Sequence, residues 1–251
     1  MKTLRRKKIE LKDRKNALVY AFWNLVNKVC ISVRFKDFQV LGRENLPKSG
    51  PFLLVSNHIT RWDGLIVYEL IGRPANFMVS PNELLGAQGA VLASMGSFPA
   101  DPRVDFINHA MNLFKKGEGM VVFPEGNIFR DGSTHNFKMG AARIAMAAAA
   151  EGIELPIIPA AIHYGADGEI AQMALGEPIS ASDYASIASQ TNGGVLRLLS
   201  DRLHREVCFL RSGLGNLGDN LALFEGSRQR PAQAASNNAV VLTAEPERKI
   251  S

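Results

Sequence analysis

Hydrophobic positions along the chain change their spacing several times, and these changes predict alternating strands and helices. Short apolar runs with the two-residue period of strands are separated by longer stretches with the 3.6-residue period of helices. The runs predicted as strands are residues 35–41, 52–56, 76–79, 120–123, 156–163 and 172–175. The predicted helices are residues 63–71, 82–94, 105–116, 137–151 and 195–210, with a shorter one capped by Ser182 or Asp183. Such alternation predicts an α/β fold.

An amphipathic helix is predicted ahead of these elements, over residues 17–35. With side chains placed at 100° per residue, its apolar residues fall within one arc, and Ile31 is the main exception. The arc consists of Leu18, Val19, Phe22, Trp23, Leu25, Val26, Val29, Cys30 and Val33. A bilayer span needs about 20 largely apolar residues, and here Asn24, Asn27 and Lys28 interrupt the run. The arc can therefore lie in a membrane interface or pack on the protein's own core, and the helix pattern leaves both open.

Charge changes the picture at the N-terminus. The chain has a formal net charge of +5, and residues 1–15 carry eight basic side chains against Glu10 and Asp13, a net +6 that leaves −1 for the remainder. The basic residues are Lys2, Arg5, Arg6, Lys7, Lys8, Lys12, Arg14 and Lys15. Because the body is not basic, no nucleic-acid partner is expected. A basic run beside an amphipathic helix favours an anionic membrane surface instead, so residues 1–35 form the first predicted segment.

Length and composition bound the class of protein. With 251 residues, 46% of them hydrophobic, the chain can enclose one large core, which we place in residues 36–225. Residues 226–251 are rich in Gln, Ala, Ser and Asn with little periodicity, which predicts a disordered tail. The two cysteines, Cys30 and Cys208, form no disulfide framework and no paired zinc motif. We expect a reducing compartment, no metal site and no bound cofactor.

Candidate chemistry gathers where two predicted strands end. One strand leads directly into His58, with Asp63 five residues further on, and another ends in Pro-Glu125-Gly126. Chemistry in an open α/β sheet collects at such strand ends. A histidine can take a proton from an alcohol, while a carboxylate on its other nitrogen fixes the tautomer and stabilises the imidazolium. The chain has no Gly-x-Ser-x-Gly and no Ser-x-x-Lys motif, so the attacking hydroxyl is expected to belong to the substrate.

Four sequence blocks between residues 35 and 180 resemble the glycerolipid acyltransferases, the family typified by lysophosphatidic acid acyltransferase. In the family's order they are Asn57-His58-x4-Asp63, Gly96 to Arg103, Phe123-Pro-Glu-Gly126 and Leu155-Pro-Ile-Ile-Pro159. The resemblance implies a mixed sheet flanked by helices, and an O-acyltransferase acting by direct attack. The donor would be acyl carrier protein or acyl-CoA. The acceptor would be the hydroxyl of a lysophospholipid, first of all lysophosphatidic acid, giving phosphatidic acid.

The resemblance also implies roles for single residues. His58 would be the general base, and Asp63 its orienting partner. The second and third blocks would hold the acceptor, which puts Arg103, Glu125 and Gly126 close to its glycerol and phosphate. Because a carboxylate repels phosphate, Glu125 would accept a hydrogen bond from a glycerol hydroxyl or hold an arginine, while Gly126 lets the backbone approach the ligand. The fourth block, ending at Pro159, would lie near the acyl donor.

The expected phosphate ligands are displaced from the family's pattern. After Gly126 the family usually continues Thr-Arg-Ser, whereas this chain reads Asn-Ile-Phe-Arg130, so the arginine comes two places late. In the second block, Arg103 stands one place late. Recognition of a phosphate still favours a guanidinium or an ammonium, and Arg103, Arg130 and Lys138 are the available candidates. The alternative for each of them is an ordinary solvated surface charge, and this alternative weighs most for Lys138.

Because the family often carries a membrane-binding helical element at its N-terminus, residues 1–35 are interpreted as interfacial. We therefore expect a peripheral or monotopic protein on the cytoplasmic face of a membrane. Two other functions stay open. The His58–Asp63 pair can serve a hydrolase of acyl thioesters or lipids, with water in place of the alcohol, or the fold can be a non-catalytic lipid-binding protein. Acyl chain length, the thioester carrier and the acceptor headgroup have no signature in the sequence.

Overall fold

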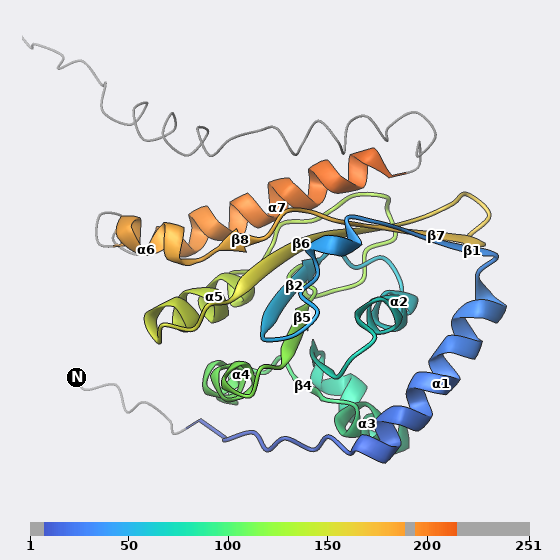
Figure 1. Ribbon diagram of the computed structural model, residues 1–251, viewed down its shortest axis with the longest axis horizontal. Coiled ribbons are helices and arrows are strands. Elements are labelled where there is room, and N and C mark those ends of the chain that lie inside the picture. The colour runs from blue at the N-terminus through green and yellow to red at the C-terminus, as the bar shows by residue number, and fades with distance from the viewer. Residues whose placement is uncertain (1–7, 189–193, 215–251) are drawn as a thin grey trace, which may run out of the picture. The chain divides into compact units, whose positions relative to one another are not determined.

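The computed structural model describes residues 8–188 and 194–214 (Figure 1). The predicted tail at residues 226–251, and the end of the domain predicted over residues 36–225, lie outside these ranges. The strands are β1 (Asp37–Leu41), β2 (Phe52–Ser56), β3 (Ala75–Val79), β4 (Ser97–Pro99), β5 (Gly119–Val122), β6 (Pro156–Tyr164), β7 (Ile170–Leu175) and β8 (Ile179–Ser180). The α-helices are α1 (Ala17–Arg34), α2 (Trp62–Ile71), α3 (Gly86–Ser94), α4 (Phe106–Lys115), α5 (Gly140–Ala150), α6 (Ser182–Ala188) and α7 (Val195–Gly213). Two short 3-10 helices are η1 (Arg43–Asn45) and η2 (Pro81–Leu84).

The described strands form one mixed sheet in the order β1-β7-β6-β2-β5-β3-β4, with β8 paired to β6. The strand β2 runs parallel to both of its neighbours, and Val55 lies opposite Val122 of β5 and Pro159 of β6. On the other side of β6, the strands β7 and β8 are antiparallel to it. The predicted mixed α/β sheet is confirmed. Its parallel centre brings the carboxyl ends of β2, β5 and β6 to one edge, where the candidate residues follow.

Helices cover both faces of the sheet (Figure 1). All five side chains of β2 are buried, and they alternate between the faces as a strand requires. Phe52 and Leu54 belong to a core cluster that includes Ile66 of α2 and Ile31 of α1. Over the other face, α5 contacts both α4 and α7. The buried residues of α5 there are mostly alanines, and small side chains allow a helix to approach a sheet closely.

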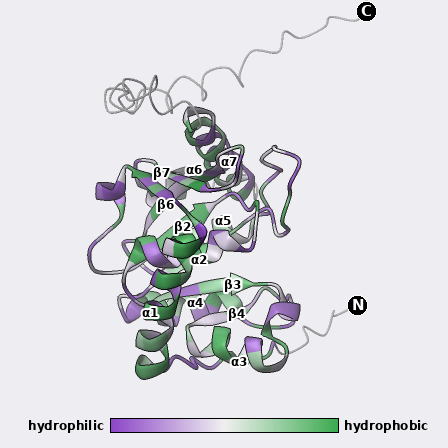
Figure 2. Ribbon diagram, turned by 90° about the vertical axis from the view of Figure 1, so that its right-hand side faces the viewer, coloured by the Kyte–Doolittle hydropathy of each residue, from purple (hydrophilic) through white to green (hydrophobic). Residues whose placement is uncertain are grey.

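The helix α1 packs on the protein with the side opposite to its apolar arc. Its buried residues are Tyr20, Asn27 and Ile31, and the Tyr20 ring lies 5.0 Å from the ring of Tyr68 in α2. Five members of the arc, which we call the apolar stripe, are 57 to 83% exposed: Leu18, Phe22, Leu25, Val29 and Val33. The rest of the arc is half-buried. Within the described residues, these five side chains do not pack on the protein's own core, whereas Ile31, the exception to the pattern, is buried there and Trp23 of the arc packs partly against it. A membrane-interface role for residues 1–35 stays a prediction. The hydrophobic turns of α1 are green in Figure 2.

The described helices include none that is long and apolar enough to cross a membrane.

Part of the basic N-terminal segment is fixed to the body. Ile9 forms a parallel bridge with Val104. The Lys15 ammonium lies 2.7 Å from Glu118 and 2.8 Å from the side-chain oxygen of Asn76, and its side chain is 14% exposed. A cation held in this way is neutralised inside the protein. Lys15 is therefore removed from the set of residues predicted to face lipid headgroups, whereas Lys8 is exposed.

Two local differences separate the sequence prediction from the structure. The helix predicted over residues 82–94 is interrupted, because Leu85 is extended and Gly86 has a φ of 65°, so η2 ends and α3 begins there. Gly89 lets the two pieces pack, since a β-carbon on it would lie 2.0 Å from the backbone of Leu84. The sequence does not predict the strands β4 and β8, because two or three residues are too short to display a period.

Candidate active site

The ends of β2 and α2 bring His58 and Asp63 together. His58 is the second residue after the end of β2, and Asp63 is the second residue of α2. The Nδ1 atom of His58 lies 2.8 Å from Oδ2 of Asp63; the histidine side chain is 20% exposed and the aspartate is fully buried. With Nδ1 taken up by the carboxylate, Nε2 is the ring nitrogen left for a substrate proton. The pair has the geometry of a histidine base with its orienting carboxylate.

The Asp63 carboxylate is surrounded by hydrogen-bond donors. Its Oδ2 atom also accepts the backbone N–H groups of Ile59, at 2.6 Å, and Thr60, at 2.9 Å. Its Oδ1 atom accepts the hydroxyl of Tyr164, at 2.5 Å, and that of Thr60, at 3.1 Å. A buried charge is tolerated where its lone pairs are met by donors, as they are here. The carboxylate is thereby fixed in one orientation beneath the imidazole.

Glu125 connects the loop after β5 to the backbone of His58. It is 4% exposed, and its two oxygens accept the backbone N–H groups of His58 and His135, each at 2.9 Å. The carbonyl of His58 in turn accepts the N–H of Phe129, at 3.1 Å. The peptide groups on both sides of the histidine are thus fixed. The structure gives Glu125 a positioning role that the sequence did not indicate, and its contact with a glycerol hydroxyl stays a prediction.

Phe123 and Lys138 complete the surroundings of the Pro-Glu-Gly turn. The Phe123 ring stacks on the His58 ring with centroids 4.3 Å apart and planes at 16°. Gly126 has a φ of 69°, a left-handed conformation that favours glycine. A β-carbon on Gly126 would lie 2.3 Å from the Lys138 ammonium, so the lysine occupies the space above the turn. A cation therefore lies where the third block is expected to meet the acceptor.

The other predicted ligands lie in different environments. Arg103 is 80% exposed and bound to Asp101 through several contacts, and no described contact joins it to the His58–Asp63 pair. Arg130 is exposed and follows Phe129, whose N–H reaches His58. Pro159 is buried within β6 beside Val55. The structure brings His58, Asp63, Glu125 and Gly126 together; ligand roles for Arg103, Arg130 and Pro159 stay predictions.

Two residues of this region were missed by the sequence interpretation. Tyr164 lies 101 positions from Asp63 in the chain and reaches it because β6 lies beside β2. The signal that could have found it is a tyrosine at the end of a strand predicted next to the histidine strand. Phe123 stood inside the third block, where its aromatic ring could have been paired with His58. His135 forms a second histidine–aspartate pair with Asp131, at 2.7 Å, in a more exposed position.

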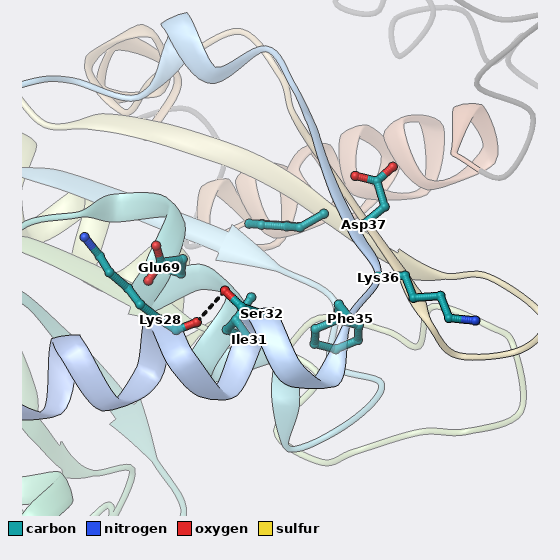
Figure 3. Close-up of a pocket in the computed structure, with 8 residues that line it drawn as sticks. Lys28, Ile31, Ser32, Phe35, Lys36, Asp37 and Glu69 are labelled. Atoms are coloured by element: carbon teal, nitrogen blue, oxygen red, sulfur yellow. Dashed lines mark hydrogen bonds between the residues drawn. The ribbon is translucent and has the colours of Figure 1, made fainter.

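A pocket of about 480 Å³ lies at the carboxyl end of α1 (Figure 3). Its lining residues are Lys28, Ile31, Ser32, Phe35, Lys36, Asp37, Phe38 and Glu69. The Phe35 ring is buried, and it also stacks on the Tyr164 ring, with centroids 5.8 Å apart. Phe35 and Tyr164 thus connect this pocket to the Asp63 carboxylate. Within residues 8–188 and 194–214, no three His, Cys, Asp or Glu side chains group in a way that could hold a metal ion.

Comparison with known proteins assigns the family. The model of the Acyltransferase family matches residues 37–163, just over half of the chain. The chain belongs to the acyltransferase family. The match contains the His58–Asp63 pair and the Pro-Glu125-Gly126 turn, and it ends at His163 on β6.

Three curated relatives of this acyltransferase chain share its central part. It is 33% identical over 136 residues to the chloroplastic 1-acyl-sn-glycerol-3-phosphate acyltransferase LPAT1 of Arabidopsis thaliana, which covers 49% of this chain and 37% of the relative. It is 33% identical over 150 residues to the chloroplastic enzyme BAT2 of Brassica napus, with 55% and 41% covered. A 1-acyl-sn-glycerol-3-phosphate acyltransferase of Borreliella burgdorferi is 26% identical over 115 residues, with 43% and 45% covered. The chain therefore spans less than half the length of these relatives.

A solved structure shares the fold. The 1-acyl-sn-glycerophosphate (LPA) acyltransferase PlsC from Thermotoga maritima superposes with a TM-score of 0.57 at 18% sequence identity, covering 75% of this chain and 79% of that one. At this identity the likeness is one of fold, a mixed sheet flanked by helices.

Proposed function

We propose that the chain is an O-acyltransferase that moves a fatty acyl group from an acyl thioester to the hydroxyl of lysophosphatidic acid, with His58 as general base. One observation carries the proposal: Asp63 holds Nδ1 of a partly exposed His58, at 2.8 Å, at the carboxyl end of the central strand. The names of the three relatives support lysophosphatidic acid as the acceptor.

The reaction can be written with the residues of the site alone. Nε2 of His58 takes the proton of the acceptor hydroxyl as its oxygen attacks the thioester carbonyl carbon. The resulting tetrahedral intermediate collapses with cleavage of the carbon–sulfur bond, and the imidazolium returns its proton to the departing thiolate. Asp63 stabilises the imidazolium during this interval, as a carboxylate does in related histidine systems. The products are phosphatidic acid and the free thiol of the carrier.

The membrane is part of the proposal because both lipids must leave water. Each buried CH₂ contributes about 0.8 kcal/mol, so a fatty chain favours a groove or a bilayer by about 10 kcal/mol. The apolar stripe of α1 is exposed and lies beside a basic segment, an arrangement suited to an anionic membrane surface. We therefore place the protein as a peripheral protein on the cytoplasmic face of a membrane. Acyl carrier protein and acyl-CoA are both kept as donors.

The test is a transfer assay on purified protein with vesicles that contain lysophosphatidic acid. Labelled acyl-CoA and labelled acyl carrier protein are supplied separately, and lipid products are identified by mass spectrometry. We expect labelled phosphatidic acid, and a loss of about 100- to 10,000-fold in the His58→Ala variant, the usual contribution of a general base. His109→Gln, which alters a buried histidine of α4, is the control at pH 7.5 and should retain activity.

Three outcomes would contradict the proposal. Release of free fatty acid at a rate independent of lysophosphatidic acid would indicate a hydrolase. Phosphatidic acid formation by His58→Ala at the parental rate would remove the base assignment. Binding of lipid without any turnover, in the parental protein and the variant alike, would indicate a lipid-binding protein.

A further inference from the structure

The two oxygens of the Asp63 carboxylate have different kinds of partner. Oδ2 faces His58 Nδ1 and the backbone N–H groups of Ile59 and Thr60, all within the turn that begins α2. Oδ1 is met by two side-chain hydroxyls, from Tyr164 at 2.5 Å and from Thr60 at 3.1 Å. The same two hydroxyls lie 3.1 Å apart. The only distant segment that bonds this carboxylate, among the residues that the structure describes, is therefore the end of β6.

The Tyr164 hydroxyl is suited to act as a permanent donor. Burial raises the pKa of Tyr164, and the negative charge of Asp63 raises it further. The hydroxyl thus keeps its proton at neutral pH and donates it to the carboxylate. A short hydrogen bond to an ionised acceptor is among the stronger kinds found in proteins.

The ring of Tyr164 is also packed against another aromatic ring, that of Phe35. Phe35, which directly follows α1, stacks on it with planes at 22°, and Phe35 also contacts Trp62 edge-on, at 5.8 Å. Trp62 directly precedes Asp63 in α2, so Phe35 contacts both the ring of Tyr164 and the residue next to Asp63 in the chain. These contacts leave the tyrosine hydroxyl little freedom to move away from Oδ1.

We propose that Tyr164 is a positioning residue of the site. Its hydroxyl fixes the Oδ1 atom of Asp63 and so keeps the carboxylate aligned with the His58 ring. A terminal carboxylate torsion is broad, and backbone donors on one oxygen leave the plane of the group free to tilt. The Tyr164 hydroxyl removes that freedom. The inference rests on the proposed function and deepens it, since it assigns a residue outside the four sequence blocks to the same pair.

The matched variants are Tyr164→Phe and Tyr68→Phe. Each removes one phenolic hydroxyl from the same core cluster, in which Tyr68 is buried and Tyr164 is partly buried. The Tyr68 hydroxyl, however, bonds the carbonyl of Tyr20, at 3.4 Å, and does not contact the His58–Asp63 pair. We expect Tyr164→Phe to lower kcat by about tenfold to a hundredfold, the scale of a small misalignment, with KM within about twofold of the parent. Tyr68→Phe should keep kcat within about twofold.

A second comparison separates positioning from a general structural effect. In the His58→Ala background the imidazole is absent, so removing the Tyr164 hydroxyl should leave the residual rate unchanged. Residues that act as a unit show this non-additivity. A purely structural role would instead lower the residual rate of His58→Ala by the same factor as the parental rate, and that result would overturn the proposal.

A spectroscopic readout keeps the inference distinct from the proposed function. In protein labelled with ¹⁵N-histidine, the Nδ1–H signal of His58 reports its bond to Asp63 whether or not the chain transfers acyl groups. We expect this signal to shift or broaden in Tyr164→Phe and to stay unchanged in Tyr68→Phe. An unchanged signal together with unchanged kcat in Tyr164→Phe would overturn the positioning role, even if the transferase activity itself were established.

Thr60 provides a further pair of variants at the same oxygen, should Tyr164→Phe fail to fold. Thr60→Val removes the other hydroxyl that bonds Oδ1, and Thr60→Ser keeps it. Because the Thr60 hydroxyl also contacts that of Tyr164, its loss should move the His58 Nδ1–H signal and lower kcat, with recovery in Thr60→Ser. A Thr60→Val protein with the parental signal and rate would contradict the view that bonds to Oδ1 align the dyad.

Discussion

Glu125 accepts the backbone N–H of His58 at 2.9 Å, so a buried carboxylate fixes the peptide that carries the candidate base. Its other oxygen accepts the N–H of His135, in the loop that follows the Pro-Glu-Gly turn. The end of β2 and the loop after β5 are therefore joined through one side chain. Both bonds go to backbone N–H groups, which every residue except proline has at positions 58 and 135. The two bonds therefore depend on the carboxylate of Glu125.

Replacement of the Glu125 carboxylate tests whether its two hydrogen bonds to backbone N–H groups are needed. In Glu125→Gln, the amide oxygen can serve one N–H, while the amide NH₂ faces the other donor and leaves it unpaired. An unpaired buried group costs about 1–3 kcal/mol, and we expect a loss of this size in the free energy of unfolding, measured with urea. We also expect kcat to fall by at least about tenfold, since the backbone of His58 is released.

The control for Glu125→Gln is Glu83→Gln, which affects a partly exposed ion pair with Arg61. Surface ion pairs contribute about 0–1 kcal/mol, so this variant should be nearly neutral in both measurements. A Glu125→Gln protein as stable and as active as the parent would show that the two backbone bonds are dispensable.

Lys138 is the cation that the structure places against the Pro-Glu-Gly turn. Among the described residues, none forms a hydrogen bond or ion pair with its ammonium, which leaves that group available to an anionic ligand. Arg103, by contrast, is neutralised by Asp101. We predict that Lys138→Met raises KM for lysophosphatidic acid about tenfold or more, as expected for loss of a charged hydrogen bond.

The comparison acceptor for Lys138→Met is a monoacylglycerol, which has the same hydroxyl and no phosphate. Its KM should not change, and Lys138→Arg should restore much of the affinity for lysophosphatidic acid. Arg103→Met should raise the KM for lysophosphatidic acid less than Lys138→Met does, because Asp101 already pairs with Arg103. An Arg103→Met protein more impaired than Lys138→Met would reverse this order and return the phosphate site to the second block.

The sequence was sufficient for those parts of the site that are close in the chain. The strand period located β2, and five positions from His58 to Asp63 span the turn into α2, so the amino-acid pattern alone was enough to pair the two residues. Tyr164 could not be inferred in the same way, because its contact with Asp63 depends on β6 lying next to β2. The role of Glu125 was also hidden, since its partners are backbone groups that any sequence possesses.

The helix α1 shows a different limit of sequence reasoning. Its apolar arc is the same whether a membrane or the protein's own core covers it, so the pattern alone could not select between them. The structure shows which side of α1 faces the core. Tyr20 and Asn27 are polar residues that find partners there: the Tyr20 hydroxyl donates to the carbonyl of Arg73, at 2.8 Å, and the Asn27 amide to that of Leu65, at 3.1 Å. The hydrophobic residues left outside define the stripe.

Membrane binding by the apolar stripe can be measured with vesicles of phosphatidylglycerol and phosphatidylethanolamine. Phe22 and Leu25 are 60% and 64% exposed, so their replacement by serine should not destabilise the fold. Full burial of one such side chain contributes about 1.5–3 kcal/mol, and even partial insertion of both predicts at least about tenfold weaker binding in the double variant. The control is the double variant Leu198→Ser and Phe209→Ser on α7, where two exposed hydrophobic residues, at 46% and 44%, lie outside the stripe. Equal loss of binding in both double variants would show that α1 has no special part.

The stability of the fold should depend on pH through two histidines, the buried His109 and the half-buried His163. Burial lowers the pKa of His109, near which Asp13 opposes the shift while Lys15 and Lys116 favour it. Burial also lowers the pKa of His163, with a smaller effect from Arg211. In the unfolded chain both residues titrate near the ordinary value of about 6.5.

The sign of this dependence follows from proton binding. As pH falls through about 6.5, both histidines bind protons in the unfolded chain but stay neutral in the folded protein, where their pKa values are lower. The free energy of unfolding therefore decreases. The decrease ends below the folded pKa values, and each histidine contributes about 1.4 kcal/mol for every unit by which its pKa is lowered. Urea unfolding between pH 7.5 and 5.5 should therefore show falling stability, and the double variant His109→Gln and His163→Gln should show a flatter profile. A double variant with the parental slope would place the titrating groups elsewhere in the protein.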